Sequence, residues 1–113
     1  MSRAVAYKPA PAPISRVMSS GDRPVVIIQE DRFDETGSVT VCAFTTDPIE
    51  APLIRLPVMP DEQNGLRMLC SLMVDKITTV PRSKLGERVG RLADEDMVGL
   101  GRAIVVFFGL AGN

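Results

Sequence analysis

This 113-residue chain contains no histidine, which limits the kinds of reaction that its side chains can catalyse. Serine–histidine and cysteine–histidine nucleophile pairs, histidine general bases and histidine metal ligands are therefore excluded. The two cysteines, Cys42 and Cys70, cannot form a four-cysteine zinc site, and each lies in an apolar run typical of a buried thiol. Any reaction must use carboxylates, arginine, lysine, hydroxyls or backbone groups, and we expect no metal and no other cofactor.

The basic residues are concentrated between residues 67 and 91, where the chain has six arginines and lysines but only two acidic residues. This segment carries a net charge of +4 inside a chain whose overall charge is −1. A local basic surface of this kind suits a transient contact with a phosphate backbone. The competing interpretation is a solvated charged surface without a partner.

The elements that would position such residues are mostly strands. Apolar and β-branched runs predict strands over residues 24–29, 38–46, 69–80 and 87–92. The near-continuous apolarity of residues 24–29 indicates a strand covered on both faces, as in a closed barrel. Residues 53–58 alternate as a half-exposed strand, and Pro57 favours an edge position for it.

A helix is predicted after the strands, beginning at Asp94 and ending near Gly109. Three carboxylates in its first turn complement the helix dipole, and Asp94 is the best candidate for the cap. Apolar residues at helical spacing predict one buried face, formed by Met97, Leu100, Ile104, Phe107 and Phe108. The expected fold is therefore mostly β, a small curled sheet with a C-terminal helix packed against it.

The N-terminal residues differ from the rest of the chain. Prolines alternate with alanines over residues 9–13, and residues 4–7 and 14–17 predict at most short strands. We expect an atypical, partly disordered segment over residues 1–20 and one folded domain over residues 21–113. No apolar run reaches the roughly 20 residues of a membrane span, so we expect a cytoplasmic protein without a membrane partner.

Several motifs occur in an order typical of one family. Residues 22–29 (DRPVVIIQ) resemble an Arg-Pro strand, and residues 39–46 (VTVCAFTT) resemble a second signature strand that ends in Thr-Thr or Thr-Ser. Residues 73–80 (MVDKITTV) resemble a segment with an acidic residue before a strand end, and residues 85–92 with the closing helix complete the pattern. On these motifs the chain resembles the MazF/PemK family of toxin endoribonucleases.

The resemblance implies an SH3-like β-barrel of the plasmid-maintenance type, shared by MazF and CcdB, that works as a homodimer. It also implies metal-independent cleavage of single-stranded RNA, and inhibition by a cognate antitoxin whose C-terminal segment covers the RNA groove. Arg23 matches the family's catalytic arginine, and Thr45 matches its catalytic hydroxyl residue. Contacts to RNA are expected from five further residues, namely Gln29, Thr46, Asp75, Lys76 and Arg82.

The two expected catalytic residues suit this reaction. A ribose 2′-hydroxyl attacks the adjacent phosphate, which leaves a 2′,3′-cyclic phosphate and a 5′-hydroxyl. Negative charge grows on the phosphate oxygens, where a guanidinium offers paired donors and a hydroxyl offers one more. Because arginine is a poor base, we assign Arg23 to charge stabilisation, with proton donation to the leaving oxygen as a secondary role. The sequence does not identify the general base.

The chain departs from the family before Arg23, where a Gly-Asp pair, a hydrophobic or aromatic strand and a Gly- and Ser-containing loop are usual. Loss of that first strand would open the barrel and expose an edge. One alternative is therefore a catalytically weak relative that binds antitoxin or RNA only. The other is a CcdB-like gyrase poison, although those proteins use a tryptophan near the C-terminus and this chain has no tryptophan.

Overall fold

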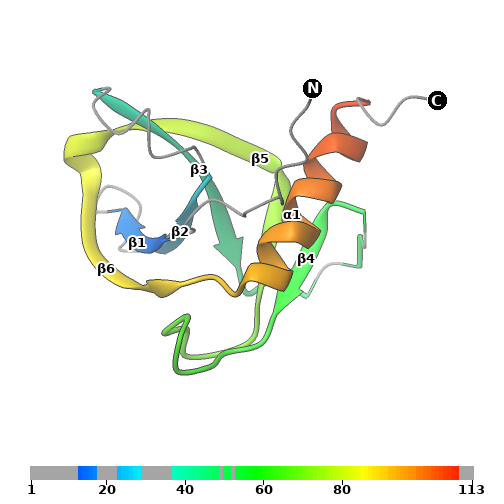
Figure 1. Cartoon of the computed structure of the whole chain (residues 1–113), viewed down its shortest axis with the longest axis horizontal. Coiled ribbons are helices and arrows are strands. Elements are labelled where there is room, and N and C mark those ends of the chain that lie inside the picture. Colours follow the sequence, from blue (N-terminus) through cyan, green and yellow to red (C-terminus); the bar gives the residue numbers. More distant parts are fainter. Residues whose placement is uncertain (1–12, 18–22, 29–36, 49, 52, 110–113) are drawn as a thin grey trace, which may run out of the picture.

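A computed structural model shows a curled antiparallel sheet and one C-terminal helix (Figure 1). It describes residues 13–17, 23–28, 37–48, 50–51 and 53–109. The elements are β1 (Pro13–Val17), β2 (Arg23–Ile27), β3 (Ser38–Thr45), β4 (Arg55–Val58), β5 (Cys70–Pro81), a 3-10 turn (Arg82–Lys84), β6 (Leu85–Arg91) and α1 (Asp94–Phe107). The predicted class, mostly β with a C-terminal helix, is confirmed.

The N-terminal strand β1 has an interior place in the sheet, between β2 and β6. Its Ile14 is fully buried in the main core, and it lies opposite Val26 of β2. A short strand was the most that the sequence predicted here, since so few residues show a strand pattern. Pairing on both sides supplies the hydrogen bonds that such a short strand needs. The other N-terminal strand candidate, residues 4–7, lies outside the described residues.

The sheet has the strand order β4-β5-β3-β2-β1-β6. The long strand β5 pairs with β4 through its first four residues and with β3 along most of its length. The 3-10 turn then leads the chain into β6. The barrel implied by the resemblance is not closed by strand pairing, because no described residues pair β4 with β6. Strand β4 has only four residues, and its Pro57 has no N–H to donate, which confirms the predicted edge position.

A tight turn after β4 lies against the other edge of the sheet. The Arg91 backbone N–H of β6 donates to the Gln63 carbonyl at 2.9 Å. The buried Asn64 side chain organises the turn, since it accepts from the Leu66 N–H at 2.9 Å and donates to the Met59 carbonyl at 2.8 Å. A Cβ at Gly90 would lie 2.4 Å from the Asn64 carbonyl oxygen, so only glycine allows this close approach. This turn, and not strand pairing, connects the two edges.

Apolar side chains fill both faces of the inner strands. The main cluster includes Ile14, Val26, Cys42, Leu72 and Leu100. A second cluster contains four buried valines, namely Val17, Val25, Val39 and Val41. Alternate residues of β2 and β3 therefore enter different clusters, which confirms that β2 is covered on both faces.

The helix α1 packs on β4 and β5 (Figure 1). Leu100 is fully buried, and Met97 and Ile104 pack against the same core. The predicted buried face is wrong at its end, because Phe107 and Phe108 are 45% and 57% exposed and contact each other instead. The predicted Asp94 cap is also wrong. Ala93 is the N-cap, and the Asp94 carboxylate instead accepts from Arg91 at 2.8 Å.

Candidate active site

Antiparallel pairing brings together two strand ends that are distant in the sequence. Val25 of β2 lies opposite Ala43 of β3, and the pairs Val26–Cys42 and Ile27–Val41 continue that register. Extending the register by two residues places Arg23, at the start of β2, opposite Thr45, at the end of β3. The β-branched composition of both segments favours these strands, and their pairing sets the relative position of the two side chains.

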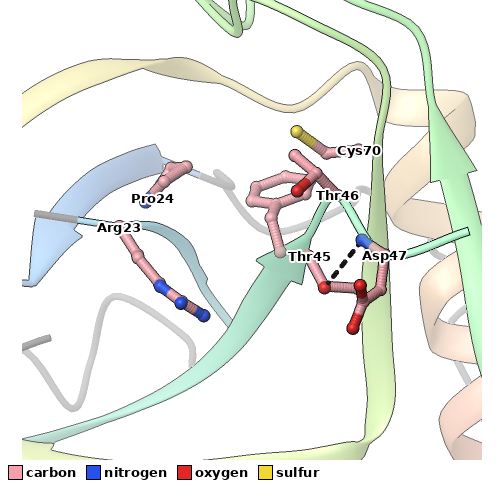
Figure 2. A pocket seen from close by; sticks show the side chains of 7 residues that line it. Arg23, Pro24, Thr45, Thr46, Asp47 and Cys70 are labelled. Carbon is pink, nitrogen blue, oxygen red and sulfur yellow. Dashed lines mark hydrogen bonds between the residues drawn. The ribbon is translucent and has the colours of Figure 1, made fainter. Parts of the chain in front are cut away.

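Arg23 and Thr45 line one open cavity of about 260 Å³. Pro24, Phe44, Thr46, Asp47 and Cys70 also line it. Figure 2 shows the Arg23 guanidinium extending toward the Thr45 side chain, with Asp47 on the far side of Thr45. The cavity therefore gathers a cation, two hydroxyls, a carboxylate and a thiol at the ends of β2 and β3 and the start of β5.

The Thr45 hydroxyl is oriented by the backbone that follows it. The Asp47 N–H donates to Thr45 Oγ1 at 3.1 Å (Figure 2). Because this bond occupies a lone pair of the oxygen, the hydroxyl proton remains available to a ligand in the cavity. Thr45 is therefore prepared to donate a hydrogen bond.

Arg23 is the cation of the cavity. Its side chain is exposed, and it has neither an ion pair nor a side-chain hydrogen bond to any described residue. A guanidinium carries five N–H donors in a planar fork that matches the oxygens of a phosphate. An anion in the cavity would therefore meet a cation that is not paired with any described side chain.

A second cavity, of about 230 Å³, adjoins the first. The two share Pro24, Thr46 and Cys70, and the second adds Arg16 and Arg67 to its lining. Its remaining lining residues are Gly65, Leu66, Met68 and Val89. The combined surface offers three arginines beside apolar area, which suits a ligand with phosphates and flat apolar groups.

Comparison with known proteins identifies the family. The sequence model described as "PemK-like, MazF-like toxin of type II toxin-antitoxin system" matches residues 11–108. The chain belongs to this toxin family. A Mycolicibacterium smegmatis protein named "Probable endoribonuclease MazF" is 59% identical over 90 residues, which cover 80% of this chain and 83% of that protein. The recognition of a MazF/PemK family member from the sequence motifs is therefore confirmed.

Solved structures of the family share the fold. The structure of "Mycobacterium tuberculosis toxin MazF-mt6" superposes with a TM-score of 0.77 at 29% identity, covering 88% of this chain and 99% of that chain. A mycobacterial endoribonuclease, solved in complex with its cognate antitoxin, superposes with a TM-score of 0.74 at 20% identity, covering 94% of this chain and all of that chain. At that lower identity the second likeness speaks for the fold alone.

The expected RNA-contacting residues of this MazF/PemK family member do not all gather at the cavities. Thr46 lines both of them. Lys76 is exposed on β5 and Arg82 lies in the 3-10 turn, and neither lines the two cavities. Gln29 lies outside the described residues.

Asp75 lies on β5 in an ion pair with Arg55 of β4, and it lines neither cavity. The Arg55 side chain is 9% exposed and that of Asp75 is 24% exposed, so the pair is largely shielded from water. Arg55 also donates to the Ile54 carbonyl at 3.1 Å. No sequence pattern indicated this pair, because its partners are 20 residues apart on strands whose register was unknown.

The two cysteines are buried, as the sequence predicted. Burial raises the pKa of the Cys42 thiol to about 12, an effect that nearby Asp75 strengthens. Burial also raises the pKa of Cys70, although Cys70 lines both cavities. Neither thiol is therefore prepared to act as a nucleophile.

The sequence interpretation missed two polar residues of the two cavities, namely Arg16 and Asp47, and included Arg67 only as part of the basic segment. Asp47 follows the Thr-Thr pair directly, and that proximity was a usable signal. Within the described part of the chain, no three potential metal ligands of the histidine, cysteine and carboxylate types gather. No described helix has the length and apolarity needed to cross a membrane.

Proposed function

We propose that this protein is the toxin of a toxin–antitoxin pair and that it cleaves single-stranded RNA in the cavity shared by Arg23 and Thr45. The observation that carries the proposal is the convergence in one open cavity of an oriented hydroxyl and a guanidinium that pairs with no described residue. Membership of the toxin family and the close relative named as an endoribonuclease support the same activity.

The proposed reaction is a transesterification within the RNA. The ribose 2′-oxygen attacks the neighbouring phosphorus, and the bond from phosphorus to the 5′-oxygen of the next nucleotide breaks. Arg23 stabilises the charge that grows on the phosphate oxygens, and the Thr45 hydroxyl donates to one of them. Because a guanidinium supplies the positive charge, we expect cleavage to continue in the presence of EDTA.

The adjoining cavity would hold the nucleotides next to the cleaved bond. Arg16 and Arg67 can bind neighbouring phosphates, and the apolar part of the lining can pack against bases. Thr46 belongs to both cavities and would contact the RNA where they meet. Lys76 and Arg82 would then contact RNA only outside the two cavities, and Asp75 would stay paired with Arg55.

The proposed partners follow from the family. A type II antitoxin is a protein, so we expect the C-terminal segment of a cognate antitoxin to cover this same groove. We also expect the toxin to work as a homodimer. Its place of action would be the cytoplasm, where messenger RNA is available.

Incubation of purified protein with a mixed-sequence RNA in EDTA tests the proposal, with product ends mapped for the wild type and for Arg23→Ala. The wild type should leave 2′,3′-cyclic phosphate and 5′-hydroxyl ends, and Arg23→Ala should not cut. Arg102→Ala is the matched control, because it removes an exposed arginine from α1 without touching the cavity. Binding of RNA without cutting would instead identify a catalytically weak relative, and inhibition of gyrase supercoiling would favour a CcdB-like poison.

A further inference from the structure

The residues assigned so far leave the RNA-cleaving reaction without a base. Attack by a ribose 2′-hydroxyl requires removal of its proton, and a general base contributes about 10²–10⁴-fold to such a step. The chain has no histidine, and an arginine side chain keeps its proton at physiological pH. Thr45 Oγ1 accepts the Asp47 N–H and is set to donate, so it does not fill the role.

Asp47 carries a carboxylate at the cavity that Arg23 and Thr45 line. It provides the one carboxyl group among the described residues that line the cavity with Arg23 and Thr45. Its backbone N–H binds Thr45 Oγ1, which holds the residue beside the hydroxyl (Figure 2). Its side chain is exposed, and it has no ion pair with Arg23 or with another described residue. The carboxylate is therefore available as a proton acceptor in the open cavity that Arg23 also lines.

We propose that Asp47 is the general base of RNA cleavage, an inference that rests on the proposed function. The carboxylate takes the proton of the 2′-hydroxyl as the 2′-oxygen forms its bond to phosphorus. The bond between phosphorus and the 5′-oxygen breaks, and its electron pair leaves on that oxygen, which takes a proton from solvent water. Asp47 then releases its own proton to solvent, so the proton balance closes without a further reactant.

Asp75 is the competing carboxylate, and its surroundings oppose the role. Its side chain is paired with Arg55, lies largely out of water and lines neither cavity. To accept a proton from RNA, it would have to leave a guanidinium that is itself buried. Such a separation is costly, because it leaves an uncompensated charge in the protein interior.

Asp47→Asn separates these possibilities, because it removes the carboxylate and keeps the backbone N–H that binds Thr45. Glu50→Gln is the matched control, since it removes an exposed carboxylate three residues away that does not line the cavity. Single-turnover cleavage should fall about 10²-fold or more in Asp47→Asn, stay near the wild-type rate in Glu50→Gln and partly recover in Asp47→Glu. Affinity for an RNA with a 2′-deoxyribose at the cleaved position should persist in Asp47→Asn.

The pH profile distinguishes a base from a residue that only positions Thr45. The other titratable groups that line the cavity are Arg23 and Cys70. A carboxylate acts as a base only in its unprotonated form, so the wild-type rate should fall toward acidic pH and Asp47→Asn should lose this limb.

Three results would overturn the assignment to Asp47. The first is an unchanged cleavage rate in Asp47→Asn, and the second is a pH profile of Asp47→Asn that runs parallel to that of the wild type. The third is loss of the acidic limb in Asp75→Asn and not in Asp47→Asn. A wild-type protein that binds RNA and does not cut it would refute the proposed function itself, and the base assignment with it.

Discussion

An arginine and an aspartate lie together at the open cavity and again between β4 and β5, and the two surroundings differ. Arg23 and Asp47 lie exposed at strand ends around an open cavity and do not pair with each other. Arg55 and Asp75 lie on neighbouring strands, largely buried, and form an ion pair. The first pair can reach a ligand, whereas the second is already neutralised.

Burial explains the difference in availability. A charge removed from water must be compensated within the protein, so Arg55 and Asp75 are held by each other and connect β4 to β5. Charges at solvent-exposed strand ends stay hydrated and can exchange water for a substrate phosphate. The comparison predicts that changes at the first pair alter catalysis and that changes at the second alter stability.

The largest expected effect is on catalysis, in Arg23→Ala. Removal of the guanidinium should lower the cleavage rate by roughly 10²–10³-fold, since charge stabilisation at phosphate is lost. The melting temperature should stay close to that of the wild type, because Arg23 is exposed and pairs with no described residue. Rate measurement together with thermal unfolding checks both halves of the prediction. A large drop in melting temperature would place Arg23 among the structural residues.

Arg55→Ala should show the opposite behaviour. It leaves the Asp75 carboxylate without its partner, and we expect a loss of about 2 kcal/mol in the free energy of unfolding. This lies below the usual figure for a fully buried pair because Asp75 retains 24% exposure. The control is Arg91→Ala, which breaks the exposed pair with Asp94 and should cost under about 1 kcal/mol. Denaturant unfolding measures both losses. If Arg55→Ala is folded and does not cut RNA, the Arg55–Asp75 pair has a role in the reaction.

Thr45→Val tests the hydroxyl at nearly constant side-chain shape. The cleavage rate should fall about 10- to 100-fold, because one donor to the transition state is lost and Asp47 loses its backbone contact. Thr79→Val is the control, since Thr79 is exposed on β5 and lines neither this cavity nor the adjoining one. Equal rates in the two variants would remove Thr45 from the proposed mechanism.

The smallest expected effect is a difference in alkylation rate between the two thiols, since Cys70 lines the cavities and Cys42 lies in the interior. Burial raises the pKa of the Cys42 thiol to about 12, and the residue is fully buried, so it should react slowly. Cys70 lines both cavities, so a small alkylating reagent should modify Cys70 first, and bound RNA should protect it. Mass spectrometry of the digested protein identifies the labelled site. Faster labelling of Cys42 in the folded protein would contradict the burial described for it.

Sequence patterns predicted most of the fold because each pattern has a local cause. β-Branched runs favour strands, Pro57 favours an edge, and three carboxylates favour the start of a helix at residue 94. One error is local, because Asp94 binds Arg91, three residues before it, instead of capping the helix. Another arose from a long-range contact, because a turn, not a strand, joins the sheet edges.

The sequence by itself determined that this chain uses no histidine chemistry, forms a mostly β domain with a final helix and belongs among the MazF/PemK toxins. It also singled out Arg23 and Thr45, which the structure brings to one cavity. Only the tertiary structure decided which of the other charges face that cavity. Asp47 reaches it and Asp75 does not, because strand register and burial, which no local pattern encodes, set the partner of each side chain.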